Sequence, residues 1–135
     1  MTPRRLIDTN LIVRHLVQDH EQHAQSAAKL FAACDRGELT LVVLPAVLAE
    51  CVFVLESFYK HPAGAIATVL SALISSPGVQ IPELAIHLDA LDRYRKTQIH
   101  FVDCLLAATA AAEGMPVATF DLQFRKFRDV SVATQ

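Results

Sequence analysis

Apolar residues along the chain fall into short continuous runs and longer stretches with helical spacing, and the two kinds alternate. The short runs, which are rich in aliphatic residues, predict strands at 5–7, 39–44, 79–81, 117–120 and 130–132. The helical stretches, with caps and breakers at their ends, predict helices at 11–17, 20–35, 46–59, 63–75, 82–96, 101–113 and 122–127. This alternation predicts an α/β fold with three α/β/α layers and a central, mostly parallel sheet of four or five strands.

The composition predicts a single domain over residues 1–135. The chain is 53% hydrophobic and 19% charged, which is enough apolar material for one sizeable core. The net charge of −2 does not by itself indicate a nucleic-acid-binding protein, although basic residues gather at 93–96 and 125–128. Runs of this kind are more often solvated helix faces than phosphate-binding sites.

The cysteines and the N-terminus indicate the cellular compartment. Cys34, Cys51 and Cys104 are widely spaced in apolar surroundings, so we expect small buried side chains in a reducing cytoplasm rather than disulfides or a zinc site. Residues 1–8 lack the apolar run of a secretory signal, and the most apolar stretch, 39–55, is interrupted by Thr40, Pro45 and Glu50. The sequence therefore predicts a soluble, cytoplasmic protein.

Four acidic residues stand at comparable places in the predicted elements. Asp8 and Asp121 each follow a strand, Glu50 lies in the second turn of the helix after the strand 39–44, and Asp103 lies in the first turn of the helix 101–113. Ligands of open parallel sheets bind outside the carboxyl ends of the strands. We therefore expect all four side chains near one edge of the sheet.

Each acid also has an ordinary structural explanation. Carboxylates favour helix N-termini, which accounts for Asp8, Asp103 or Asp121 taken singly. Glu50 is harder to explain in this way, because its helical neighbours are apolar and the polar stripe of its helix runs through Glu56. A carboxylate on an apolar face is costly to bury unless another group pairs with it.

Basic partners close in sequence are few. Glu50 and Asp103 have no Arg or Lys within four positions, and Arg125 is the one plausible local partner of Asp121. Four converging carboxylates would repel one another, and a divalent cation removes this conflict. All-oxygen ligands favour Mg²⁺ or Mn²⁺ over zinc. We therefore expect Asp8, Glu50, Asp103 and Asp121 to bind a metal ion and to form a catalytic site.

Other common catalytic sites lack their sequence motifs. His20 and His23, with His15 nearby, have no further ligands at metal spacing, and we interpret them as a solvated helix start. The chain has no GxSxG elbow, Walker loop or GxGxxG turn.

The motifs around the four acids resemble those of PIN-domain nucleases, and most closely the VapC-like toxins of bacterial and archaeal toxin–antitoxin pairs. The matching segments are Leu6-Ile7-Asp8-Thr9-Asn10, Glu50 after a strand, Val102-Asp103-Cys104-Leu105-Leu106-Ala107, and Ala118-Thr119-Phe120-Asp121 with Phe124. The resemblance extends from residue 6 to about 132.

The resemblance implies a PIN-like domain that acts as a Mg²⁺- or Mn²⁺-dependent endoribonuclease. It also implies a homodimer, inhibited by a small VapB-like antitoxin. The acidic quartet would be Asp8, Glu50, Asp103 and Asp121, with Asp8 and Asp103 as core metal ligands, and Asn10 and Thr119 as supporting residues that help to order it. The chemistry would be metal-assisted hydrolysis of an RNA phosphodiester.

Two other functions remain open. A haloacid-dehalogenase-like phosphatase would use Asp8 as its nucleophile, but Asn10 stands where that family has a second Asp, and no lysine lies in a convincing motif. A non-catalytic PIN-fold interaction module is the other alternative, supported by the apolar side chains Phe53, Phe58 and Tyr59. The ordinary explanation of those three is core packing.

Overall fold

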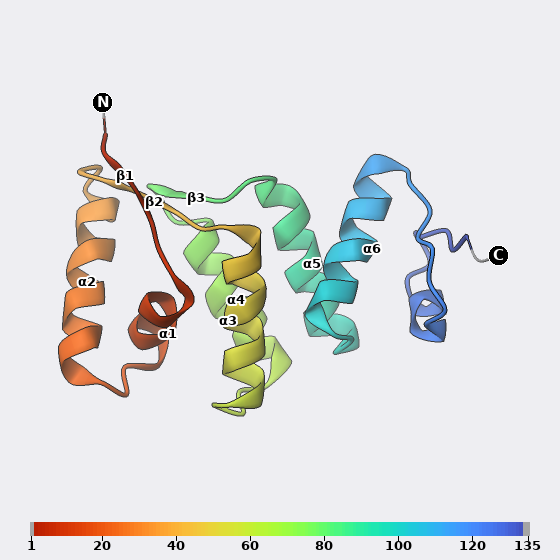
Figure 1. The fold of residues 1–135 in the computed structure, drawn as a ribbon, viewed down its shortest axis with the longest axis horizontal. Coiled ribbons are helices and arrows are strands. Elements are labelled where there is room, and N and C mark those ends of the chain that lie inside the picture. Colours follow the sequence, from red (N-terminus) through yellow and green to blue (C-terminus); the bar gives the residue numbers. More distant parts are fainter. Residues whose placement is uncertain (1, 134–135) are drawn as a thin grey trace. The chain divides into compact units, whose positions relative to one another are not determined.

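A computed structural model describes residues 2–133 of the chain (Figure 1). By its internal contacts the chain divides into two compact units. Unit 1 comprises Met1–Leu84 and unit 2 comprises Ala85–Gln135. A single domain over residues 1–135 stays a prediction. Within the described residues, no helix combines the length and apolar character needed to cross a membrane.

Unit 1 contains a parallel sheet in the order β1-β2-β3, formed by Arg4–Leu6, Thr40–Val42 and Val79–Gln80. Leu41 of the middle strand pairs with Arg5 on one side and with Val79 on the other. Leu41 and the following Val43 are fully buried. This is the burial that a continuous aliphatic run predicts for a central parallel strand.

Strand β1 differs from the prediction. All three of its residues are exposed, with Leu6 at 68% of its full accessibility, and burial begins only at Ile7. The predicted strand is present, one residue earlier than 5–7, but the burial that its apolar run implies is wrong for Leu6. The physical reason is that β1 is an edge of the three-stranded sheet, where charged side chains such as those of Arg4 and Arg5 are common.

Four helices complete unit 1: α1 Thr9–Val17, α2 Glu21–Asp35, α3 Pro45–Ser57 and α4 Ala63–Ile74. Asp8 caps α1 and His20 caps α2, while Pro45 occupies the first turn of α3, where its missing N–H is not needed. Helix α1 contacts both α2 and α3, and α4 contacts α3 and β3. The start of α1 thus lies between two neighbouring helices.

Unit 2 consists of α5 Leu84–Thr97, which begins at the last residue of unit 1, then α6 Phe101–Glu113 and the 3-10 helix η1 Leu122–Lys126. The predicted strands at 117–120 and 130–132 meet in one parallel bridge between Val117 and Val132. The whole chain is therefore a helix-rich α/β fold with a parallel sheet, as predicted.

Candidate active site

Asp8 and Glu50 line the same hollow of about 420 Å³ in unit 1, where α1 faces α3. Asp8 lies two residues after β1, and its Oδ1 accepts a hydrogen bond of 2.9 Å from the backbone N–H of Leu11. This bond caps α1, so helix capping explains one of the two carboxylate oxygens of Asp8. Within residues 2–133 its second carboxylate oxygen has no hydrogen-bond partner, which leaves it available to a ligand.

Glu50 projects from the side of α3 that faces away from the core. The helix buries Leu48, Cys51, Val52 and Leu55, whereas Glu50 is exposed and Phe53, three residues on, is 61% exposed. The expectation that Glu50 lies on a face to be buried is therefore wrong: its apolar neighbours belong to the surface. Among the described residues Glu50 has no hydrogen bond or ion pair, and its carboxylate faces the hollow unneutralised.

The buried thiol of Cys51 lies within reach of both carboxylates. Burial raises its pKa to about 12, and the negative charges of Glu50 and then Asp8 contribute to the rise. A thiol with this pKa is protonated at neutral pH and is a poor nucleophile and a poor metal ligand. Cys51 does not line the hollow, and the carboxylates there offer oxygen ligands rather than sulfur. The prediction that all three cysteines are small buried side chains is confirmed, since Cys34, Cys51 and Cys104 are free and buried.

Asp103 lies in the first turn of α6 in unit 2 and is half-buried. It does not cap its helix, because the cap position is His100 and no side chain caps the end. No hydrogen bond or ion pair joins the Asp103 carboxylate to the described residues, so capping does not explain it. Burial raises the pKa of the neighbouring Cys104 thiol to about 11, and the negative charge of Asp103 adds to this rise.

Asp121 caps η1 through its Oδ1, which accepts a hydrogen bond of 2.9 Å from the N–H of Gln123. The hydroxyl of Thr119 accepts a bond of 3.0 Å from the N–H of Asp121 and so shapes the turn that presents this carboxylate. The sequence left Arg125 open as a partner of Asp121. Across residues 2–133 no ion pair joins the two.

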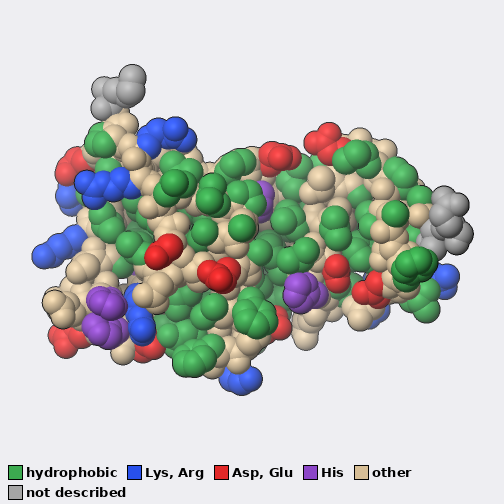
Figure 2. Space-filling view, in the orientation of Figure 1, with side chains coloured by type: hydrophobic (Ala, Val, Ile, Leu, Met, Phe, Trp, Pro, Cys, Tyr) green, Lys and Arg blue, Asp and Glu red, His purple; other side chains and the backbone are tan. Residues whose placement is uncertain are grey.

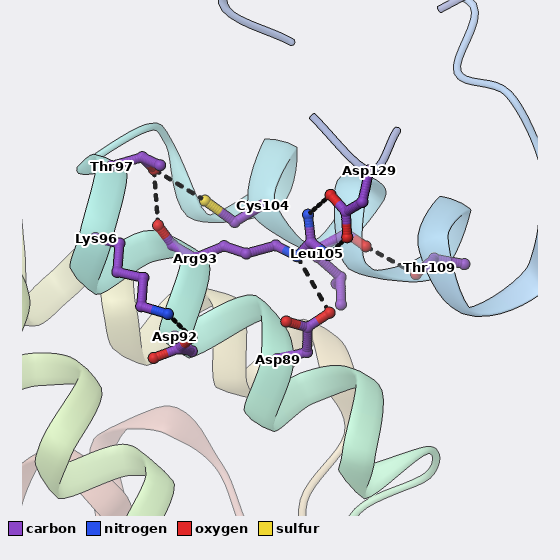
Figure 3. A network of polar contacts seen from close by, with 9 residues as sticks. All are labelled: Asp89, Asp92, Arg93, Lys96, Thr97, Cys104, Leu105, Thr109 and Asp129. Carbon is purple, nitrogen blue, oxygen red and sulfur yellow. Dashed lines mark hydrogen bonds and ion pairs between the residues drawn. The ribbon is translucent and has the colours of Figure 1, made fainter. Parts of the chain in front are cut away.

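A network centred on Arg93 joins separate parts of unit 2 (Figure 3). The Arg93 guanidinium donates two hydrogen bonds to Asp129, of 2.9 and 2.5 Å, and one of 3.1 Å to Asp89, and it lies 5.7 Å from the ring centroid of Phe127. The Thr97 hydroxyl donates to the carbonyl of Arg93 and accepts from the N–H of Ile99. These bonds connect α5 to the loop before α6 and to the segment after η1.

The donor chemistry of the four acids fits a hard divalent cation. All are carboxylates, and none makes an ion pair among the residues described. Oxygen ligands without basic partners suit Mg²⁺ or Mn²⁺. The structure brings Asp8 and Glu50 together in unit 1 and places Asp103 and Asp121 in unit 2, and neither unit gathers three candidate ligands from its described residues. A common site for all four stays a prediction.

The sequence was compared with models of known protein families. The model of the PIN domain matches residues 5–130, nearly the whole chain and all four acids. The chain belongs to the PIN-domain family. No curated protein matches it. The PIN domain is a nuclease-type fold, and this membership supports a hydrolase.

Aromatic side chains that the sequence named only in support of an interaction module lie beside Asp8 in this PIN domain. Phe58 and Tyr59 line the hollow beside Glu50, and Phe58 is 74% exposed, so core packing is the wrong explanation for Phe53 and Phe58. Asn10, a predicted supporting residue, also lines the hollow.

His20 is a helix start as predicted, since its Nδ1 accepts a hydrogen bond from the N–H of His23.

Proposed function

We propose that this PIN domain is a Mg²⁺- or Mn²⁺-dependent endoribonuclease that hydrolyses phosphodiester bonds of RNA. The observation that carries the proposal is the pair of carboxylates, Asp8 and Glu50, that face one hollow without basic partners among the described residues. In a chain of a nuclease-type family, such a pair is what a cation that binds a phosphate oxygen requires.

In this proposal the four acids act at one site. Asp8 and Asp103 are the core ligands of the cation, and Glu50 and Asp121 complete its shell directly or through water. Asn10 and Thr119 support them, and the hydrogen bond from the Asp121 N–H to the Thr119 hydroxyl is an example of this ordering. A bound cation of this kind lowers the pKa of a coordinated water and polarises the phosphate. The protein's own part is to fix the oxygen ligands by capping bonds, as for Asp8 and Asp121.

We further propose that the protein is the cytoplasmic toxin of a VapBC-type pair, a homodimer inhibited by a small antitoxin protein. The motif resemblance around Asp8, Glu50, Asp103 and Asp121 supports this role. Exposed apolar side chains support contacts with protein partners: Val102 and Leu106 lie one turn apart on α6, and Phe120 is 92% exposed. Three free cysteines agree with a reducing compartment.

A second candidate function is a PIN-fold interaction module without turnover. The exposure of Phe53 and Phe58 on one end of α3 favours it, because exposed aromatic side chains are typical of protein interfaces. This candidate and the nuclease differ in whether RNA is cut.

The proposal is tested by incubating a total RNA pool with the full chain in Mg²⁺, in Mn²⁺ or in EDTA, and following fragment lengths on a denaturing gel. We expect cleavage with either cation and none in EDTA. Equal cleavage in EDTA would contradict metal-assisted hydrolysis, and no cleavage in any condition would favour the interaction module.

A further inference from the structure

A second hollow, of about 240 Å³, adjoins the first on the other side of α1. Helix α1 contributes Asn10, Leu11 and Arg14 to it, and α2 contributes His23, Ser26 and Ala27. Asp8 and Asn10 line both hollows. The two hollows therefore meet at the start of α1, with the Asp8 carboxylate at their junction.

The two hollows differ in chemistry. The first is lined by aromatic and aliphatic side chains, including Phe58, Tyr59 and Val54, and no Lys, Arg or His of the described residues lines it. The second offers the Arg14 guanidinium, the His23 imidazole and the Ser26 hydroxyl. Figure 2 shows this change across one face of unit 1, with acidic and hydrophobic side chains over α1 and α3, and histidine side chains near the start of α2 with a basic side chain beside them.

One carboxylate, that of Asp19, holds a side chain from each hollow. The Tyr59 hydroxyl donates to Asp19 Oδ2 at 2.8 Å, and Nη1 of Arg14 donates to Asp19 Oδ1 at 2.8 Å. The hydrogen bond from Tyr59 and then that from Arg14 lower the pKa of Asp19, so it remains ionised and keeps both contacts. Both hollows therefore have a lining side chain that is fixed before any ligand binds.

We propose that the two hollows form one continuous track for single-stranded RNA across the Asp8 carboxylate. A base stacks on the face of the exposed Phe58 ring in the first hollow, where the Tyr59 ring stands at an interplanar angle of 73° to it, and the phosphate that flanks the cleaved bond binds Arg14, His23 and Ser26 in the second. Every base has an aromatic face, whereas phosphate oxygens prefer guanidinium and hydroxyl donors. The reverse orientation is disfavoured because a flanking phosphate in the first hollow would face Glu50 without a basic side chain in the lining. This inference rests on the proposed function.

The phosphate end is tested by steady-state cleavage of a short single-stranded RNA in Mg²⁺. The double variant His23→Ala/Ser26→Ala is expected to raise KM about tenfold, with kcat within about twofold. The control is Gln22→Ala/Gln25→Ala, two exposed side chains on the same helix that do not line this hollow, and it should leave KM unchanged.

The role of the Arg14 charge is tested by salt dependence. Arg14→Gln should reduce the slope of log KM against log salt by about 0.7, the value for one phosphate contact with a single strand, whereas Arg14→Lys should retain the slope. If Arg14 has a purely structural role, the slope of log KM against log salt should be the same in Arg14→Gln and Arg14→Lys, and that result would contradict a phosphate contact.

The base end is tested with Phe58→Ala, which should raise KM about tenfold without changing the salt slope. Phe53→Ala removes an exposed aromatic side chain from α3 that does not line the hollow, and it should have no effect on KM. A KM unchanged in Phe58→Ala would mean that this end is a protein-binding surface, and would overturn the track.

The outcomes separate this inference from the proposed function. Wild-type chain that cleaves RNA, with variants that match their controls, would overturn the track alone. Wild-type chain that neither binds nor cleaves RNA would overturn both.

Discussion

Asp8→Asn is expected to reduce metal-dependent RNA cleavage by more than about 100-fold, beyond the loss that changes to outer-shell partners of a metal cause. The change replaces an anionic ligand oxygen by a neutral amide and removes one of the two charges in the hollow. Asparagine caps helices as well as aspartate does, so the bond to the N–H of Leu11 has a replacement acceptor. The free energy of unfolding should fall by only about 1 kcal/mol, through the weaker interaction with the helix dipole.

Cleavage by Asp8→Asn is measured in Mg²⁺ and in Mn²⁺, beside urea unfolding of the same preparation. Asp35→Asn makes the same chemical change at an exposed position in unit 1 and serves as the control that should stay active. Metal-dependent cleavage retained by Asp8→Asn would refute the assignment of this carboxylate.

Gly78→Ala should destabilise the protein by about 3 kcal/mol, combining the cost of a left-handed residue with that of overpacking. The N–H of Val79 donates to the carbonyl of Ser76, which makes a turn with Pro77 and Gly78 at its centre, and Gly78 has φ +80°. A Cβ there would lie 2.6 Å from Cys34 Sγ and 2.7 Å from the Cys34 carbonyl oxygen. The carbonyl is backbone at the end of α2 and accepts a bond from Gly37, so it has little freedom to move.

Gly37→Ala separates the cost of the left-handed backbone conformation from the cost of the steric clash. Gly37 has nearly the same backbone conformation, φ +77°, but a Cβ there meets nothing within 4 Å. It should destabilise by only about 1 kcal/mol. Urea unfolding with equal slopes gives both values, and equal losses in the two variants would contradict the predicted clash.

Helices whose ends are marked by a glycine or a proline were predictable from the sequence. Helix α6 begins and ends where the pattern predicts, at Phe101 and Glu113, because Gly114 adopts the left-handed conformation, φ +65°, that stops a helix, and Pro116 follows. Helix α3 begins one residue earlier than predicted, at Pro45, since a proline fits the first turn.

Burial was less predictable, because it depends on what packs against an element. Leu6 reads as buried from its apolar neighbours, yet it lies in an edge strand and is exposed. The apolar residues near Glu50 likewise read as core. Only the packing of α3 shows that Leu48 and Leu55 form the buried side of the helix and that Phe53 remains on the surface.

The acids were recognisable by position and motif, but their surroundings were not. Arg14, His23 and Ser26 are ordinary helix-surface residues in the sequence, and they line one hollow only because α1 contacts α2. The contact of Asp19 with Tyr59, 40 residues apart, has no local signal either.

The central proposal, that Asp8 and Asp103 bind the same cation, is tested most directly by Mn²⁺ affinity in a double-mutant cycle. Titration calorimetry of wild-type chain, Asp8→Asn, Asp103→Asn and the double variant gives the four values. We predict that each single change weakens Mn²⁺ binding at least about tenfold and that the double variant loses much less than the sum, because ligands of one ion are coupled. Full additivity of the two losses, as for independent sites, would contradict the account.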